Sequence, residues 1–137
     1  MTITVRAGTH YQQRLAAEPA QIRRVRRITA ALLRYWGWGE AVDPALVCVT
    51  ELLANVDRHV RPSECELRLA ASPSLVRIVV SDGSRTLPVL REPDPYAEEG
   101  RGMLMIAAVA HTWGADLTSY GKAVWVELHP AGQEAAA

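Results

Sequence analysis

The stretch TELLANVDRHV, residues 50–60, carries polar residues at every fourth position, which are Glu51, Asn55 and His59. On an α-helix, positions four apart differ by only about 40° around the axis, so these side chains share one stripe. A carboxylate and a carboxamide one turn apart suit phosphoryl transfer. The amide oxygen is a hard, neutral ligand for the Mg²⁺ that bridges phosphates, and the carboxylate can orient or deprotonate an attacking hydroxyl. Taken alone, the helix slightly favours a simpler interpretation, in which the stripe faces solvent.

A second candidate lies where the strand VRIVVSDGS ends, at Asp82 and Gly83. A carboxylate at the end of a buried strand can accept a hydrogen bond from an amine, such as the exocyclic amine of adenine. The same dipeptide is often only a turn, so by itself it leaves both interpretations open.

A third candidate is the segment EEGRGMLMI, in which Gly100, Arg101 and Gly102 directly precede an apolar helix. Glycines allow the backbone to approach a ligand closely, and the N-terminus of a helix presents free N–H groups to a phosphate. Arg101 adds a cation that could reach the same phosphate. A structural turn with a solvent-exposed arginine is at least as good an interpretation of this segment.

Hydrophobic periodicity predicts the elements that position these residues. Asp43 and Pro44 are expected to start the second helix, as its N-cap and its first helical residue. Residues 84–101 are expected to form one long loop, and Gly121 and Lys122 a tight hairpin turn. The predicted strands span 3–5, 11–17, 65–71, 75–80, 115–120 and 123–129, and the predicted helices span 19–36, 43–60 and 103–111.

This order of elements predicts an α+β two-layer sandwich, with a mixed, largely antiparallel sheet and the helices on one face. One domain at residues 1–129 and a flexible tail at 130–137 account for the 137 residues. Hydrophobic residues make up 49% of the chain, which supplies one apolar core. No internal repeat marks a second domain.

The charge pattern argues against direct binding to nucleic acid, because the formal net charge is +0 and a nucleic-acid footprint is basic. The exception is a cluster of arginines at residues 23–27, which is typical of a solvated helix face and is one candidate partner surface. No apolar run is long enough to cross a membrane and no signal segment opens the chain, so we expect a cytoplasmic protein without a membrane partner. Cys48 and Cys65 lack metal-ligand spacing and are expected to be buried free thiols.

The order of the three candidate segments resembles the GHKL ATP-binding fold, which histidine kinases, gyrase and the Hsp90 chaperone share. The sequence is most similar to the small bacterial anti-sigma-factor serine/threonine kinases of the RsbW and SpoIIAB type. TELLANVDRH resembles their N box, SDG their first glycine box and GRGMLMIAAVAHTWG their second, and YGKAVWVEL resembles their closing hairpin. The resemblance runs from about residue 15 to residue 129.

The resemblance implies an ATP- and Mg²⁺-dependent anti-sigma factor that binds a sigma factor. It also implies a kinase that phosphorylates a serine or threonine of an anti-anti-sigma partner with a STAS domain, and a homodimer. Residues 84–99 would form the lid over ATP. The implied roles are general base for Glu51, Mg²⁺ ligand and nucleotide contact for Asn55, adenine recognition for Asp82 and Gly83, and phosphate binding for Gly100, Arg101, Gly102, Met103 and Leu104.

The sequence departs from this family at two positions. Glycine follows Asp82 directly, with Ser84 in the third place, where the family commonly has Asp-x-Gly. Ala123 stands where the family has a threonine that contacts the purine. These departures leave a second interpretation open, which is a non-catalytic interaction module of the same fold with weak or no nucleotide binding.

Three further residues are interpreted as structural. His59 is expected to cap or pack near the helix end, with no catalytic role. Trp113 and Trp125 are expected to lie in the core rather than in a site.

Overall fold

A computed structural model of the protein describes residues 3–6, 9–88 and 101–129, with the backbone alone at 3–6 and 101. The chain forms six strands, three α-helices and one short 3₁₀ helix within these residues. In chain order they are β1 (Ile3–Arg6), β2 (His10–Ala16), α1 (Pro19–Tyr35), η1 (Gly39–Ala41), α2 (Val42–His59), β3 (Glu64–Ala71), β4 (Val76–Asp82), α3 (Arg101–Val109), β5 (Thr112–Leu117) and β6 (Lys122–Leu128).

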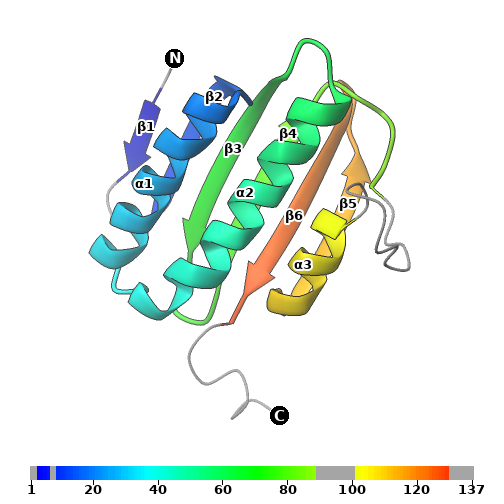
Figure 1. Ribbon diagram of the computed structural model, residues 1–137. Helices are drawn as coiled ribbons and strands as arrows, with labels where there is room; N and C mark the ends of the chain where they lie inside the picture. The colour runs from blue at the N-terminus through cyan, green and yellow to red at the C-terminus, as the bar shows by residue number, and fades with distance from the viewer. Residues whose placement is uncertain (1–2, 7–8, 89–100, 130–137) are drawn as a thin grey trace.

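The strands form one sheet in the order β1-β2-β3-β4-β6-β5, as Figure 1 shows. Each pair of neighbouring strands in the described sheet is antiparallel. The last two strands do not follow chain order, because β6 lies between β4 and β5. The predicted α+β two-layer architecture is confirmed, and the described pairs contain none of the parallel pairing that a mixed sheet would have.

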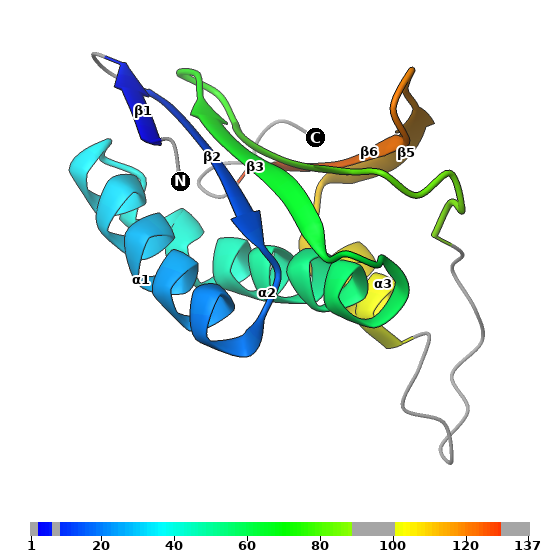
Figure 2. The same cartoon turned by 90° about the horizontal axis from the view of Figure 1, so that it is seen from above.

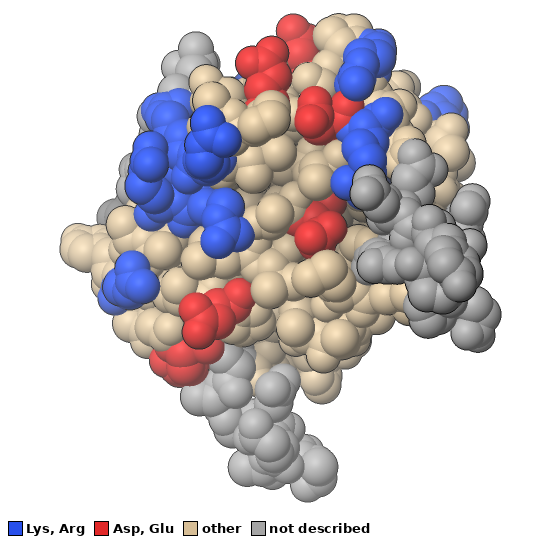
Figure 3. Space-filling model, in the orientation of Figure 1, with Lys and Arg blue, Asp and Glu red and all other residues tan. Residues whose placement is uncertain are grey.

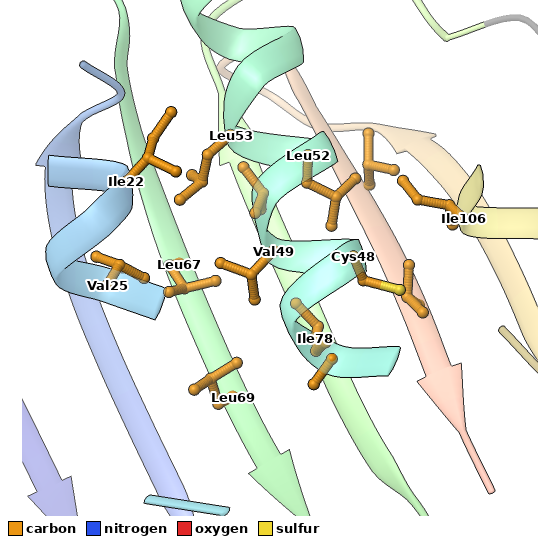
Figure 4. Packing of buried hydrophobic residues seen from close by; sticks show 14 of the residues in the cluster. Ile22, Val25, Cys48, Val49, Leu52, Leu53, Leu67, Leu69, Ile78 and Ile106 are labelled. Carbon is orange, nitrogen blue, oxygen red and sulfur yellow. The ribbon is translucent and has the colours of Figure 1, made fainter. Parts of the chain in front are cut away.

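All three helices lie on one face of the sheet, and Figure 2 shows them as a separate layer. Buried and partly exposed positions alternate along β3, β4 and β6, because successive side chains of a strand point to opposite faces. The buried face meets the apolar sides of the helices in one core (Figure 4). Side chains labelled there include Val25 from α1, Leu52 and Leu53 from α2, Leu67 from β3 and Ile106 from α3.

Helix α2 is central to the helical layer, since it contacts α1 on one side and α3 on the other. It begins at Val42, one residue before the predicted start, and its N-cap is Ala41 without a side-chain cap. The prediction that Asp43 caps this helix is therefore wrong. The physical reason is that η1 runs directly into α2, so the chain is already helical when it reaches Asp43. Asp43 instead places a carboxylate in the first turn, where the helix dipole favours it.

The hairpin between β5 and β6 also differs from the prediction. Its turn is Thr118–Gly121, closed by a hydrogen bond from the Thr118 N–H to the Gly121 carbonyl oxygen. The Thr118 hydroxyl accepts from the Gly121 N–H at 3.0 Å, which stabilises the turn at this position rather than at Gly121 and Lys122. Lys122 is consequently the first residue of β6 and not part of the turn.

Basic side chains gather over α1 on the face drawn in Figure 3. Arg23 and Arg27 are exposed, as expected of a solvated helix face. Arg26 is half-buried and donates to the Leu46 carbonyl oxygen on α2, so it ties the two helices together. The two cysteines are buried and free, as predicted. No helix among the described residues is long and apolar enough to cross a membrane.

Candidate functional site

The candidate site is a cavity of about 420 Å³ between helices α2 and α3 and the ends of β4 and β6. This volume lies within the range of small-molecule pockets, about 300–1,000 Å³. Its walls are mainly apolar, with a few polar groups that point to a ligand of mixed character. The lining residues are Leu52, Asn55, Val56, His59, Val80, Asp82, Thr86, Leu87, Pro88, Gly102, Met103, Lys122 and Val124.

Helix α2 brings Glu51 and Asn55 to the side of the cavity that faces α3. Asn55 lines the cavity directly, whereas Glu51 lies one turn earlier, beside it. A Cβ built on Gly102 would lie 2.8 Å from the Glu51 Oε2 and 3.6 Å from the Asn55 Oδ1. Both side chains therefore point at the first turn of α3, and a Cβ at position 102 would require the Glu51 carboxylate to shift.

The carboxamide of Asn55 has a partner at each end. Its Nδ2 donates to the Met103 sulfur at 3.6 Å, and its Oδ1 accepts from the Arg58 guanidinium at 2.6 Å. The oxygen is a suitable Mg²⁺ ligand, and Arg58 is exposed and thus able to move away. The described residues contain no cluster of three or more acidic, histidine or cysteine ligands. A cation held by Asn55 would therefore take its remaining oxygens from a ligand and water, as Mg²⁺ bound to phosphates does.

The N-terminus of α3 closes the same side of the cavity. Gly102 and Met103 are buried and line the cavity, whereas Leu104 is half-buried and is not among the lining residues. The first N–H groups of a helix have no intrahelical partner, so they can donate to an anion. Of the predicted phosphate-binding residues, Arg101 begins the helix, and its side chain and Gly100 lie outside the described residues.

The floor of the cavity carries a buried ion pair that sequence patterns did not predict. Asp82 ends β4 and lies directly opposite Lys122, which begins β6. The Lys122 Nζ donates to the Asp82 Oδ1 at 3.0 Å, and the two side chains keep only 9% and 2% of their exposed surface. The Ser84 N–H donates to the same oxygen at 2.8 Å. The sequence contains the dipeptides Asp82-Gly83 and Gly121-Lys122, but only the strand register shows that they lie opposite each other.

The neighbouring Ala123 occupies a different place from the one expected. It pairs with Ser81, and since side chains alternate along a strand it faces away from Asp82. The residue beside the predicted base-binding carboxylate is thus Lys122 and not Ala123. Gly121 permits the close approach of the two strand ends, because a Cβ there would collide with the Asp82 carbonyl oxygen.

The segment after β4 forms another wall. Thr86, Leu87 and Pro88 line the cavity, and Arg85 donates to the Thr118 carbonyl oxygen at 2.7 Å, which holds this segment against the hairpin turn. Gly83 is exposed, and a Cβ there would meet only the Tyr120 carbonyl oxygen at 3.9 Å. Within the expected lid of residues 84–99, the portion 89–99 lies outside the described residues.

Of the three residues interpreted as structural, Trp125 lies elsewhere than expected. His59 ends α2, is exposed and lines the cavity. Trp113 packs against the core as predicted. Trp125 lies on the opposite face of the sheet, where its Nε1 donates to Asp116 and its ring lies 4.9 Å from the Arg77 guanidinium. The alternation of β6 explains this position, because Trp125 is an odd number of residues from the buried Lys122.

The arrangement combines apolar walls, one buried donor–acceptor pair, one amide oxygen, one carboxylate and the N-terminus of a helix. Apolar walls with a few polar groups suit a flat heterocycle, and free N–H groups beside a metal-ligating amide suit phosphates. A family model described as the histidine kinase-like ATPase domain matches residues 15–128. No curated protein matches the chain significantly.

Proposed function

The chain belongs to the histidine kinase-like ATPase domain family, and from this premise we propose that it is an ATP- and Mg²⁺-dependent anti-sigma factor of the RsbW and SpoIIAB type. Membership in this family implies that the protein binds ATP. The proposal adds that it binds a sigma factor and phosphorylates a serine or threonine of an anti-anti-sigma partner with a STAS domain. It acts as a homodimer in the cytoplasm.

The placement of Glu51 and Asn55 carries the proposal. The two side chains lie one turn apart, and both approach the first turn of α3 at Gly102. A phosphate bound at that turn would therefore lie beside a carboxylate and an amide oxygen. Asn55 would hold Mg²⁺, which when bound neutralises charge on the phosphates.

In the proposed reaction, Glu51 accepts the proton of the partner's hydroxyl group as that oxygen attacks the γ-phosphorus of ATP. A new bond forms between the hydroxyl oxygen and the phosphorus, and the bond between the γ-phosphorus and the bridging oxygen breaks. ADP leaves with the electron pair of the broken bond. The N–H groups at Gly102, Met103 and Leu104 hold the phosphates, together with Gly100 and Arg101.

The base of ATP is proposed to lie at the ion pair. Asp82 accepts from the exocyclic amine, Gly83 lies at the edge of the base, and the apolar residues Leu52 and Val80 face the ring. A charged acceptor binds an amine more strongly than a neutral one does.

The test of the kinase proposal is Glu51→Gln, which removes the base and keeps the size of the side chain. We expect normal ATP binding by calorimetry and no transfer of labelled phosphate to a cognate STAS-domain protein. Asp57→Asn is the matched control, because Asp57 lies on the same helix but does not line the cavity. Normal transfer by Glu51→Gln would exclude Glu51 as the base.

The second candidate function is a non-catalytic interaction module of the same fold. The observation in its favour is that one oxygen of each polar residue proposed to bind the nucleotide already has a partner, since Lys122 bonds to the Asp82 Oδ1 and Arg58 bonds to the Asn55 Oδ1. Calorimetry with Mg-ATP separates the candidates. If millimolar nucleotide produced no heat and no thermal shift, this result would favour the non-catalytic module.

A further inference from the structure

The ion pair on the cavity floor has unused hydrogen-bonding capacity. An ammonium has three N–H donors, and among the described residues Lys122 has one acceptor, the Asp82 Oδ1. That oxygen also accepts from Ser84, whereas the Asp82 Oδ2 has no hydrogen-bond partner in the described part of the chain. Spare donors and a spare acceptor thus lie side by side.

Both side chains are almost fully buried yet line the cavity, so their spare groups face the space that a ligand would fill. An unpaired polar group in such a place is costly, and more so when it is charged. A ligand that supplies an acceptor for Lys122 beside a donor for Asp82 would therefore be stabilised here.

A carboxylate alone would distinguish strongly between purines. It accepts from the 6-amino group of adenine, whereas a 6-oxopurine held in the same position would place the lone pairs of its 6-oxo group against it. A 6-oxopurine shifted so that its N1–H donates to the carboxylate would leave the 6-oxo group without a donor. A site whose buried polar group matches only one ligand rejects the other by several orders of magnitude.

The ammonium beside the carboxylate removes this distinction. For adenine, the 6-amino group donates to Asp82 and ring nitrogen N1 accepts from Lys122. For a 6-oxopurine, N1–H donates to Asp82 and the 6-oxo oxygen accepts from Lys122. Both bases present a donor next to an acceptor along the same edge, in opposite order, and the unused groups of the ion pair can serve either order.

We propose that Lys122 is a specificity-determining residue that makes this site accept 6-oxopurine nucleotides, such as GTP and ITP, as well as ATP. The inference rests on the proposed nucleotide binding at Asp82. It assigns to Lys122 a direct contact with the base, in addition to its ion pair.

The first experiment is a calorimetric titration of the full chain with Mg-ATP, Mg-GTP and Mg-ITP, with Mg-CTP as the pyrimidine control. We expect the Kd values of GTP and ITP to lie within about tenfold of that of ATP, a difference of about 1.4 kcal/mol. If ATP binds but the Kd values of GTP and ITP are more than tenfold higher than that of ATP, the inference is overturned and the proposed function stays intact. Failure of all four nucleotides to bind overturns the proposed nucleotide binding itself.

The second experiment compares Lys122→Met, which removes the donors, with Lys122→Arg, which keeps them. We expect Lys122→Met to weaken the binding of GTP relative to that of ATP by at least tenfold. Lys122→Arg should keep the ratio of the two Kd values that the wild-type protein has. An unchanged ratio in a folded Lys122→Met variant contradicts the role of Lys122. The wild-type titrations decide the base preference even if neither variant folds.

Discussion

The Lys122 ammonium lies 3.0 Å from the Asp82 Oδ1, and this contact joins the start of β6 to the end of β4. It places one positive and one negative charge on the floor of an otherwise mainly apolar cavity. Two buried charges are costly unless each neutralises the other, so this pair contributes to the stability of the fold, and we propose that it also selects the ligand of the cavity.

The first prediction concerns the energy of this ion pair. Lys122→Met or Asp82→Ala alone should each lower the free energy of unfolding by about 3–5 kcal/mol, because either leaves one buried charge unpaired. The double variant should lose clearly less than the sum. Urea unfolding of the four proteins measures the coupling, and additivity within about 0.5 kcal/mol would contradict the prediction.

The exposed pair Arg77 and Glu127 provides the matched control for this cycle. The Arg77 Nη1 lies 2.7 Å from the Glu127 Oε2, also between β4 and β6, but the two side chains remain 41% and 24% exposed. Solvent screens such a pair, and we expect a coupling of no more than about 1 kcal/mol.

The second prediction concerns the metal ligand. Asn55→Ala should abolish the gain in nucleotide affinity that Mg²⁺ produces, while affinity in the presence of EDTA stays close to that of the wild-type protein. Calorimetry with and without Mg²⁺ measures the difference. A full Mg²⁺ effect in Asn55→Ala would assign the metal to other ligands.

Arg58→Ala is the control for that experiment. Arg58 bonds to the Asn55 Oδ1 at 2.6 Å and would compete with the proposed cation for this oxygen. Its removal should preserve or increase the Mg²⁺-dependent affinity, opposite in direction to Asn55→Ala.

The third prediction concerns Gly102. Alanine there would place its Cβ 2.8 Å from the Glu51 Oε2, which is the end of a flexible side chain and can shift. The variant should therefore fold, with stability changed by no more than about 1 kcal/mol, since alanine favours a helix over glycine. The rate of phosphate transfer should fall at least tenfold, because displacing a catalytic group by about 1 Å lowers a reaction rate by that factor or more.

Gly39→Ala is the corresponding control, since no atom lies within 4 Å of a Cβ built there and the position is in η1. It should leave phosphate transfer unchanged. Equal transfer by Gly102→Ala and the wild-type protein would show that the position of Glu51 does not limit the reaction.

The fourth prediction concerns pH. Burial raises the pKa of Cys48 from 9.0 to about 12, and burial, followed by the charge of Asp82, raises the pKa of Cys65 from 9.0 to about 12. Below pH 9 the thiols are protonated in both the folded and the unfolded chain. Between pH 9 and 12 the unfolded chain releases these protons and the folded chain keeps them, so stability falls as pH rises.

Each thiol should contribute a slope of about 1.4 kcal/mol per pH unit in that window. Urea unfolding at several pH values from 8 to 10.5 measures the slope. Cys48→Ala should reduce the slope by the contribution of one thiol, whatever the effect of the substitution on the free energy of unfolding at pH 8. Identical slopes for this variant and the wild-type protein would contradict the pKa of Cys48.

Much of the fold could be predicted because it depends on local patterns. Apolar spacing of three and four indicated α1 and α2, and alternation indicated β3 and β6. Boundaries were less secure, since the start of α2 depends on η1 and the β5–β6 turn depends on the Thr118 hydroxyl. These contacts involve side chains and neighbouring elements whose positions a local pattern does not specify.

The candidate site divides in the same way. The sequence by itself determined that Glu51 and Asn55 share one side of a helix, because four residues make about one helical turn. The tertiary structure alone decided that Gly102 faces them and that Asp82 meets Lys122 rather than a neighbour of it. Strand pairing between residues 40 positions apart makes this choice, and a shift of one residue in register would have turned Lys122 to the other face of the sheet.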